Sequence, residues 1–275
     1  MLPFIFRFMK QTNTILDKIL RDKALEVELA IKNQPLSYST VMAARRTEVR
    51  DFFEALGKPG KLGVIAEIKK ASPSAGLIRP DFNHLSIAAD YETSGLVDVI
   101  SILTESKYFQ GQLAFIKEIK AITTMPLFRK DFIFDEYQIY ESYLAEADAL
   151  LLIAAALESS QLKHLLEITH SLGLKALVET HSREEIEQAL EAGAKIIGIN
   201  ARDLKTFKMH QDLFSQLVKF LPKNSIKVAE SGLENEDDIK KVYDAGANAV
   251  LIGTSIMKAQ NIKEKIYELI PKYYE

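Results

Sequence analysis

The chain has 275 residues, of which 47% are hydrophobic and 27% are charged, a composition that excludes disordered and fibrous classes. Its 35 basic and 38 acidic residues leave a net charge of -3, which gives no large electrostatic attraction to nucleic acid or to an anionic membrane. Cysteine is absent, which excludes disulfides, thiolate metal sites and a cysteine nucleophile, and which fits a reducing compartment.

The first ten residues, MLPFIFRFMK, are apolar and resemble the start of an export signal. The run is short, contains Pro3 and Arg7, and lacks a small-residue cleavage site, so we expect a cytoplasmic protein. Met9 is an alternative natural start of the chain. No stretch approaches the roughly 20 apolar residues of a membrane span, so no membrane association is expected.

Two helices are expected before the first strand, over residues 14–32 and 40–55, with a break near Asn33 to Pro35. The turn-rich sequence GKPGKLG at 57–63 then leads into the first strand. This N-terminal part is too small to be assigned as a second domain.

From Leu62 onward, short β-branched runs alternate with helical patterns. We expect eight strands, over residues 62–69, 97–104, 126–130, 148–154, 174–179, 195–200, 226–230 and 248–253. Amphipathic helices are expected between them, for example over residues 112–122, 159–173, 183–193 and 235–246. Glycine ends three of these helices, as a left-handed C-cap favours.

The strand ends recur about every 20 to 35 residues, a spacing that favours a (β/α)8 TIM barrel of the α/β class. An open doubly wound sheet is the alternative, but it usually has fewer strands and a glycine-rich fingerprint that IKKASPSAG does not supply. We therefore expect residues 1–275 to form a single TIM-barrel domain, with an N-terminal helical extension at 1–61 and the barrel at 62–270.

Polar residues stand at the ends of the expected strands, where barrel enzymes carry their active sites. They are Glu67, Lys69, Lys130, Glu179, Asn200 and Glu230. A single charge of this kind often belongs to a structural ion pair, but five converging charges cost several kcal/mol to bury unless they pair or serve a ligand. A mixture of lysine and glutamate suits general acid–base catalysis, whereas three scattered glutamates beside two lysines make a poor metal site, so no metal is expected.

Small residues follow the seventh and eighth strands, in ESG at 230–232 and IGTS at 252–255. Backbone amides there could hold a phosphate, although Gly232 and Gly253 are equally found in plain tight turns. Lys69 and Ser72 would add a cation and a hydroxyl across the mouth.

The first two loops that follow strands leave alternatives open. KASPSAGLIRPDF at 70–82 has the composition of a mobile lid or of a plain surface loop. Tyr108 and Phe109 in the second loop would pack either on an aromatic substrate or on the barrel rim. The five histidines are expected in structural or solvated positions: His84, His164, His170, His181 and His210.

The motif VIAEIKKASPS at 64–74 resembles the signature of the indole-3-glycerol phosphate synthase family. The resemblance continues along the barrel through PLFRKDFIFDEYQIYE at 126–141, LLLIAAAL at 150–157, LVETHSREE at 177–185, IIGINARDL at 196–204, VAESGL at 228–233 and AVLIGTSIM at 249–257. It implies ring closure of a phosphorylated aromatic amino-sugar, with loss of carbon dioxide and water and without a cofactor. Other enzymes of the tryptophan pathway are the protein partners that it suggests.

The resemblance also implies catalytic roles for four residues. Lys130 matches the general acid, Glu179 the general base, Glu67 the carboxylate that orients the acid, and Lys69 a cation that serves the substrate carboxylate and proton transfer. The division of proton-transfer steps between the two lysines stays open.

Ten further positions match substrate-binding residues of the family. Asn200 and Glu230 match polar positioning groups, and Arg202, Ser231 and Leu251 line the same site. Ser72, Gly232, Gly253 and Thr254 match the phosphate grip, and Phe109 matches a wall of the aromatic pocket. The chain departs from the common family pattern at Ala75, Gln112, Glu146, Ala201 and Thr254, none of which is an implied catalytic group.

Three other functions are alternatives for a barrel with these residues. The neighbouring phosphoribosylanthranilate isomerase family uses a cysteine base, which this chain lacks. A Schiff-base aldolase also places a lysine on a barrel strand. A silent barrel that only binds a phosphorylated ligand would have no need for the Glu67, Lys130 and Glu179 set.

Overall fold

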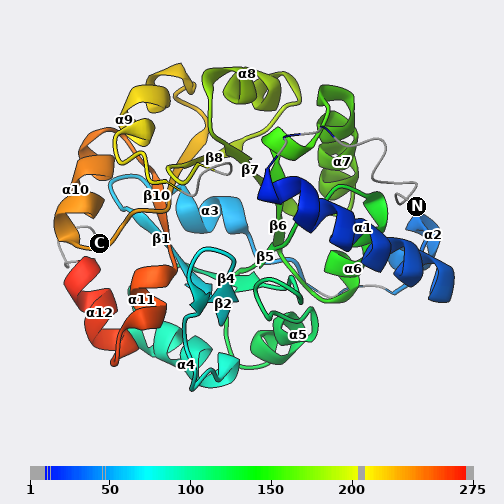
Figure 1. Ribbon diagram of the computed structural model, residues 1–275, viewed down its shortest axis with the longest axis horizontal. Helices are drawn as coiled ribbons and strands as arrows, with labels where there is room; N and C mark the ends of the chain where they lie inside the picture. Colours follow the sequence, from blue (N-terminus) through cyan, green and yellow to red (C-terminus); the bar gives the residue numbers. More distant parts are fainter. Residues whose placement is uncertain are drawn as a thin grey trace.

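Eight parallel strands close into a barrel in the computed structural model, which describes residues 10, 12, 14–44, 46, 48–203 and 208–270. The order around the barrel is β1-β10-β9-β8-β7-β6-β5-β4, so strands that follow one another in the chain are neighbours (Figure 1). The strands are β1 (Gly63–Ile68), β4 (Val99–Leu103), β5 (Leu127–Lys130), β6 (Ala149–Ile153), β7 (Lys175–Thr180), β8 (Ile196–Asn200), β9 (Ile226–Glu230) and β10 (Ala249–Ile252). Each expected strand overlaps one of them, and the TIM barrel is confirmed.

Helices surround the strands (Figure 1). They are α4 (His84–Ser94), α5 (Ala114–Lys120), α6 (Glu136–Leu144), α7 (Ser159–Ser171), α8 (Arg183–Glu191), α9 (Leu213–Leu217), α10 (Glu236–Asp244), α11 (Thr254–Lys258) and α12 (Ile262–Leu269), with 3-10 turns η2 (Ala154–Ala156) and η3 (Val218–Phe220). The helices expected over 112–122, 159–173, 183–193 and 235–246 are confirmed as α5, α7, α8 and α10. The Gly173, Gly193 and Gly246 residues that follow three of them have positive φ values, as a left-handed helix end requires.

The N-terminal part contains α1 (Ile15–Asn33), α2 (Tyr38–Ala43) and α3 (Phe52–Leu56). The first expected helix is confirmed as α1, but a single helix over 40–55 is wrong. The chain leaves α2 after Ala43, and Asp51 then caps α3 by accepting hydrogen bonds from the backbone of Phe53 and Glu54. Between the helices, the backbone and side chain of Arg50 bond to Asp148 and to the carbonyl of Met125, contacts that a continuous helix would not allow.

Three strands are preceded by a polar residue that bonds to the start of a neighbouring strand. Asp98 accepts from Val64 N at 3.1 Å, Asp148 from Leu127 N at 2.8 Å, and Asn248 from Lys227 N at 3.0 Å. These side chains satisfy backbone donors at the amino end of the barrel, where the ladder of strand hydrogen bonds begins.

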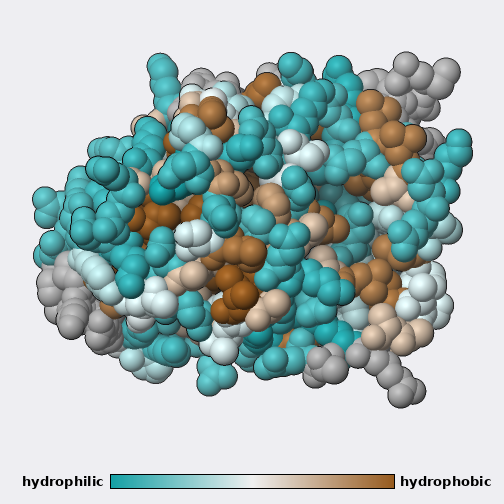
Figure 2. Space-filling view, turned by 90° about the horizontal axis from the view of Figure 1, so that it is seen from below, coloured by the Kyte–Doolittle hydropathy of each residue, from teal (hydrophilic) through white to brown (hydrophobic). Residues whose placement is uncertain are grey.

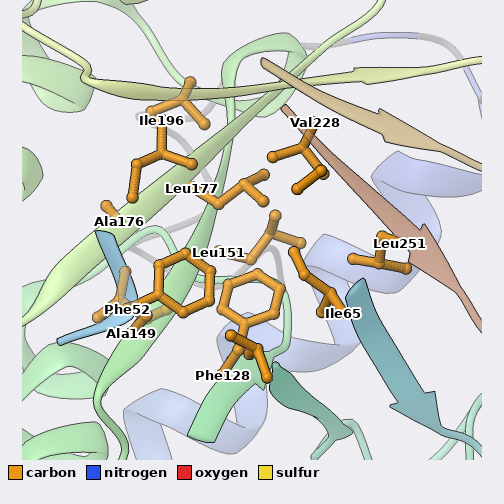
Figure 3. Packing of buried hydrophobic residues seen from close by; sticks show 14 of the residues in the cluster. Phe52, Ile65, Phe128, Ala149, Leu151, Ala176, Leu177, Ile196, Val228 and Leu251 are labelled. Carbon is orange, nitrogen blue, oxygen red and sulfur yellow. The ribbon is translucent and has the colours of Figure 1, made fainter. Parts of the chain in front are cut away.

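Different helices of the N-terminal part lie at the two ends of the barrel. At the amino end of the strands, Phe52 and Leu56 of α3 are fully buried, and the Phe52 ring packs on Phe128 with centroids 5.4 Å apart (Figure 3). In Figure 1, α3 lies at the centre of the ring of strands. At the opposite end, Ile15, Leu16 and Ile19 of α1 border the cavity described below.

The outer face seen in Figure 2 is mostly hydrophilic, with apolar residues in small separate patches. Such scattered apolar exposure is ordinary for a folded protein. Among the described residues, no helix combines the length and hydropathy that crossing a membrane requires. The apolar run at 1–9, with the alternative start at Met9, lies outside the described residues.

Candidate active site

A cavity of about 460 Å³ opens at the carboxyl ends of the strands. Its volume suits a small-molecule ligand. The expected site residues that line it are Glu67, Lys69, Ser72, Phe109, Lys130, Glu179, Asn200, Arg202, Ser231, Gly232, Leu251, Gly253 and Thr254. The remaining expected residue, Glu230, is 1% exposed and pairs with Lys130 beside the cavity.

Lys130, the last residue of β5, is surrounded by three carboxylates from other strands. Its Nζ lies 2.7 Å from Glu230 Oε2, 3.7 Å from Glu179 Oε2 and 3.9 Å from Glu67 Oε2. The three glutamates come from β9, β7 and β1, which are far apart in the chain. The barrel thus brings together the charges that the sequence placed at separate strand ends.

This arrangement shifts the protonation of its members. Burial lowers the pKa of Lys130, but the negative charges of Glu230, Glu179 and Glu67 outweigh it and raise the pKa. Burial, reinforced by the nearby Glu179 and Glu67 charges and opposed by Lys130, raises the pKa of Glu230 to about 7. The raised pKa keeps Lys130 protonated, so it has a proton to donate. Glu230 is a carboxyl group with a pKa near neutrality.

Glu67 is held differently from Glu230. Lys69 Nζ lies 2.5 Å from Glu67 Oε1, so the two residues at the end of β1 face each other as their spacing predicts. Burial favours the neutral form of Glu67, but the charges of Lys69 and Lys130 overcome it and lower the pKa. Glu67 is therefore a charged carboxylate between two lysines.

Two glycines make room for these carboxylates. A Cβ atom on Gly253 would lie 2.3 Å from Glu67 Oε1, and one on Gly198 would lie 2.0 Å from Glu230 Oε1. Both distances are far inside van der Waals contact. Gly253 was expected only as a turn or phosphate-binding residue, and Gly198 was not expected in the site at all.

The loop after β9 has the backbone geometry of a small-residue turn. Ser231 and Gly232 have φ values of 66° and 74°, and this left-handed region is uncommon for a residue with a side chain. Across the mouth, Arg202 N donates to Asn200 Oδ1 at 3.0 Å. Together with Thr254 and Ser72, these residues form the polar rim of the cavity.

The first two loops resolve into specific contacts. The 70–82 loop contains an antiparallel hairpin of β2 (Ala71–Ser72) and β3 (Gly76–Leu77), and Ala71 N donates to Phe109 O at 3.3 Å. The Tyr108 hydroxyl donates a hydrogen bond to Asp22 of α1, so Tyr108 packs on the barrel rim, which is one of the two positions expected for it. Phe109 lines the cavity and packs on Phe132 with centroids 6.1 Å apart.

Helix α1 is a part of the site that the sequence did not predict. Its Ile15, Leu16 and Ile19 side chains form an apolar border of the cavity. The helix is fixed to the barrel by buried Lys23, whose Nζ lies 3.2 Å from Asp131 Oδ1, next to Lys130. The sequence predicted a helix over 14–32 but did not indicate which surface of the barrel that helix covers.

The sequence prediction also missed Lys258 as a residue of the cavity and His181 as a neighbour of Glu179. Lys258 borders the cavity one helical turn after Thr254, on the same face of α11. His181, expected only in a structural or solvated position, lies with Nε2 3.4 Å from Glu179 Oε1. Its position two residues after Glu179 was the signal that could have indicated this contact.

The departures from the family pattern fall in different places. Ala75 also lines the cavity, where it presents a methyl group in place of a common lysine. Ala201 is buried and its amide donates to Glu230 O at 2.9 Å. Glu146 lies far from the mouth, before β6, and has a φ of 68°, which explains why glycine is common there.

Residues 16–269 match the family model described as Indole-3-glycerol phosphate synthase. A protein of that name from Alkaliphilus metalliredigens (strain QYMF) is 46% identical over 255 residues, covering 93% of this chain and 97% of the relative. Another of that name, from Caldanaerobacter subterraneus subsp. tengcongensis, is 45% identical, covering 94% of this chain and 98% of the relative.

Similar solved structures include an N-acetylmannosamine-6-phosphate 2-epimerase from Clostridium perfringens, with a TM-score of 0.61 and 16% identity over 82% of this chain and 99% of that chain. A 3-hexulose-6-phosphate synthase from Salmonella typhimurium has a TM-score of 0.60 and 13% identity over 76% of this chain and 96% of that chain. At such low identity these likenesses show the barrel fold alone.

Proposed function

The chain belongs to the indole-3-glycerol phosphate synthase family, and we infer that it catalyses the reaction that gives the family its name. This reaction closes the ring of 1-(2-carboxyphenylamino)-1-deoxyribulose 5-phosphate, releases carbon dioxide and water, and forms indole-3-glycerol phosphate in tryptophan biosynthesis. The observation that carries the proposal is the position of Lys130, which lines a ligand-sized cavity and has three glutamate carboxylates around its Nζ.

In the first step, Lys130 is the general acid. Its Nζ–H donates to the carbonyl oxygen of the substrate as the aromatic carbon that bears the carboxylate attacks the carbonyl carbon. Proton donation prevents an alkoxide from forming while the new carbon–carbon bond forms. Glu67 supports this role because its charge lies 3.9 Å from Lys130 Nζ.

In the second step, the carboxylate leaves as carbon dioxide and its bonding electron pair restores the aromatic ring. Lys69 is placed for the substrate carboxylate, because its Nζ is paired with Glu67 at the edge of the cavity. A cation there binds the carboxylate in the starting complex and releases it as its charge is lost.

In the third step, Glu179 is the general base for dehydration. It removes the proton whose loss forms the indole double bond, while the hydroxyl group leaves as water with a proton from a lysine of the cluster. Glu179 is 3% exposed, and such burial keeps solvent from competing for the proton.

The remaining cavity residues bind the rest of the substrate. Ser72, Gly232, Gly253 and Thr254 are proposed to hold the phosphate, with Lys69 as the nearby cation. Asn200, Arg202, Glu230 and Ser231 position the sugar hydroxyls, and Leu251 and Phe109 contact the aromatic ring. Support comes from the cavity that all of these residues except Glu230 line and that α1 borders; Glu230 lies beside it, paired with Lys130.

A Schiff-base aldolase is disfavoured by the same cluster. Its lysine must lose a proton to attack a carbonyl, but the three carboxylates raise the pKa of Lys130 and oppose that loss. Borohydride trapping with a carbonyl substrate should therefore leave Lys130 unmodified.

The purified protein should convert the aminodeoxyribulose phosphate into a product with indole fluorescence and release one carbon dioxide per turnover. The assay needs no added metal or cofactor. A well-folded protein that gives no indole product would reject the proposed function.

Three broader proposals follow. The α1–α3 extension and the barrel form one domain, because α1 borders the cavity and α3 is buried in the barrel core. The protein acts in the cytoplasm, a location that the absence of cysteine fits. Other tryptophan-pathway enzymes are its proposed partners, because they supply its substrate and consume its product; co-purification from cell extract tests this.

A further inference from the structure

His181 lies directly after β7, between the proposed base Glu179 and helix α8. Its side chain is 13% exposed, and the neighbouring Ser182 caps α8 by accepting from Glu185 N at 3.3 Å. The cap fixes the first turn of α8 and places the Glu185 side chain over the histidine.

Glu185 holds His181 at two points. Its Oε2 accepts from His181 N at 2.7 Å and lies 3.2 Å from His181 Nδ1. One carboxylate oxygen thus fixes both the backbone and the ring of the histidine, so the direction of the other ring nitrogen is also set.

That other nitrogen faces the active site. His181 Nε2 is buried, lies 3.4 Å from Glu179 Oε1 and has no hydrogen-bond partner among the described residues. The second oxygen of Glu179, Oε2, lies 3.7 Å from Lys130 Nζ. The Glu179 carboxylate therefore stands between the proposed acid and His181.

We propose that His181 is a positioning residue that, fixed by Glu185, holds and orients the Glu179 carboxylate through Nε2. The inference rests on the proposed role of Glu179 as the base. His181 keeps Oε1 of Glu179 directed away from Lys130, so that only Oε2 faces the acid.

The imidazole must be charged to perform this role. A neutral ring carries one N–H, whereas the carboxylates of Glu185 and Glu179 each require a donor. Burial lowers the pKa of His181, but the hydrogen bond to Glu185 and the charges of Glu179, Glu185 and Glu230 raise it overall. Because the pKa is raised above 6.5, the positioning contact is present at lower pH and is lost as pH rises through the pKa of the folded protein.

The test compares kcat and KM from pH 5.5 to 9 for the unaltered protein, His181→Gln and Glu185→Gln. In His181→Gln, kcat near neutral pH should fall about 10-fold with little change in KM, and the titration step that belongs to the imidazole should disappear from the pH profile. In Glu185→Gln, that step should move to lower pH, because the imidazolium loses one carboxylate neighbour. His84→Gln is the matched control, because His84 also pairs with a glutamate, Glu118, on α5 and away from the cavity.

If His181→Gln and Glu185→Gln both kept the pH profile of the unaltered protein, the inference would be overturned. If His181 were purely structural, its replacement would lower the melting temperature and leave the pH profile unchanged. NMR titration of the imidazole nitrogens is independent of turnover. Glu179→Gln should lower the His181 midpoint, and an unchanged midpoint would contradict the contact. An unaltered protein without turnover would instead reject the proposed function, so the two failures are distinguishable.

Discussion

At the carboxyl ends of the strands one lysine faces three glutamates, whereas at the amino ends one aspartate faces two cations. Lys130 lies beside a cavity, and Glu230 Oε1 has no hydrogen-bond partner among the described residues. Asp148 is fully buried and both its oxygens are satisfied. They accept from Arg46 Nη2 at 2.5 Å, Arg50 N at 2.9 Å, Lys120 Nζ at 2.8 Å and Leu127 N at 2.8 Å.

The difference separates the charges that we propose to react from the charges that hold the fold. The Asp148 carboxylate links α5, β5 and the segment before α3. Both of its oxygens accept hydrogen bonds. The Lys130 cluster places three carboxylates around one ammonium group, and burial raises the pKa of one of them, Glu230, to about 7. Incomplete pairing is unfavourable for stability but leaves groups able to exchange protons with a substrate.

The largest expected effect is at the amino end. Asp148→Ala leaves the Arg46 and Lys120 side chains buried without their carboxylate, and we expect a loss of about 3 to 5 kcal/mol in unfolding free energy. Urea unfolding measures it. Asp244→Ala removes an exposed pair with Lys240 and should cost less than about 1 kcal/mol. Equal losses of unfolding free energy in Asp148→Ala and Asp244→Ala would contradict the conclusion that the Asp148 cluster holds the fold.

At the carboxyl end, Lys130→Ala should lower kcat by roughly 100-fold or more, because the general acid is removed. Its loss of stability at pH 6 should be smaller than that of Asp148→Ala. The pKa of Glu230 already lies at about 7, so this carboxyl group takes up a proton instead of remaining an unpaired charge. A nearly unchanged kcat would reject the role of Lys130 as acid.

The pH dependence of stability should differ within the carboxyl-end cluster. Between pH 4.5 and about 7 the folded protein retains a proton on Glu230 that the unfolded chain has released, so the Glu230 contribution to stability falls as pH rises. Glu230→Gln should therefore raise the unfolding free energy at pH 8 by about 1 to 2 kcal/mol, although it should lower activity.

Glu67→Gln is the control of opposite sign. The pKa of Glu67 is lowered, so its contribution to stability is present above its unfolded pKa and is lost as pH falls through its folded pKa. The variant should therefore be less stable than the unaltered protein at pH 8. Urea unfolding at pH 5 and pH 8 measures both effects, and the same sign for both variants would contradict the assignment of charges.

The barrel could be predicted from the sequence because short apolar runs, each ending in a polar or small residue, alternate with helical patterns at a near-regular spacing. The convergence of the polar strand-end residues followed, because parallel strands in a barrel bring their ends together whatever the loops between them do, whereas Arg202 and Leu251 were indicated only by the family resemblance. The 40–55 helix was wrong because Arg46 and Arg50 bond to Asp148, about 100 positions away, and local pattern carries no such information. The roles of helix α1 and His181 in the site were missed for the same reason, because they depend on tertiary contacts with Asp131 and Glu185.

A smaller effect is expected near Asp148. Glu146 has a φ of 68°, and its carbonyl accepts from Arg46 Nη2 at 2.9 Å. Glu146→Gly should raise the unfolding free energy by about 1 kcal/mol, because glycine adopts this backbone conformation without steric cost. Glu146→Ala removes the same side chain but keeps the Cβ atom, so it should not stabilise. Stabilisation by both variants would assign the effect to the side chain instead.

The smallest expected effect tests binding without proton transfer. Thr254 borders the cavity from the first turn of α11, and it is not within the Lys130 cluster. Thr254→Ala should raise KM several-fold with little change in kcat, because a lost phosphate contact weakens substrate and transition state alike. Thr254→Ser keeps the hydroxyl and should restore KM. A loss confined to kcat would place Thr254 among the reacting groups and would contradict the division between the residues that bind the phosphate and those that move protons.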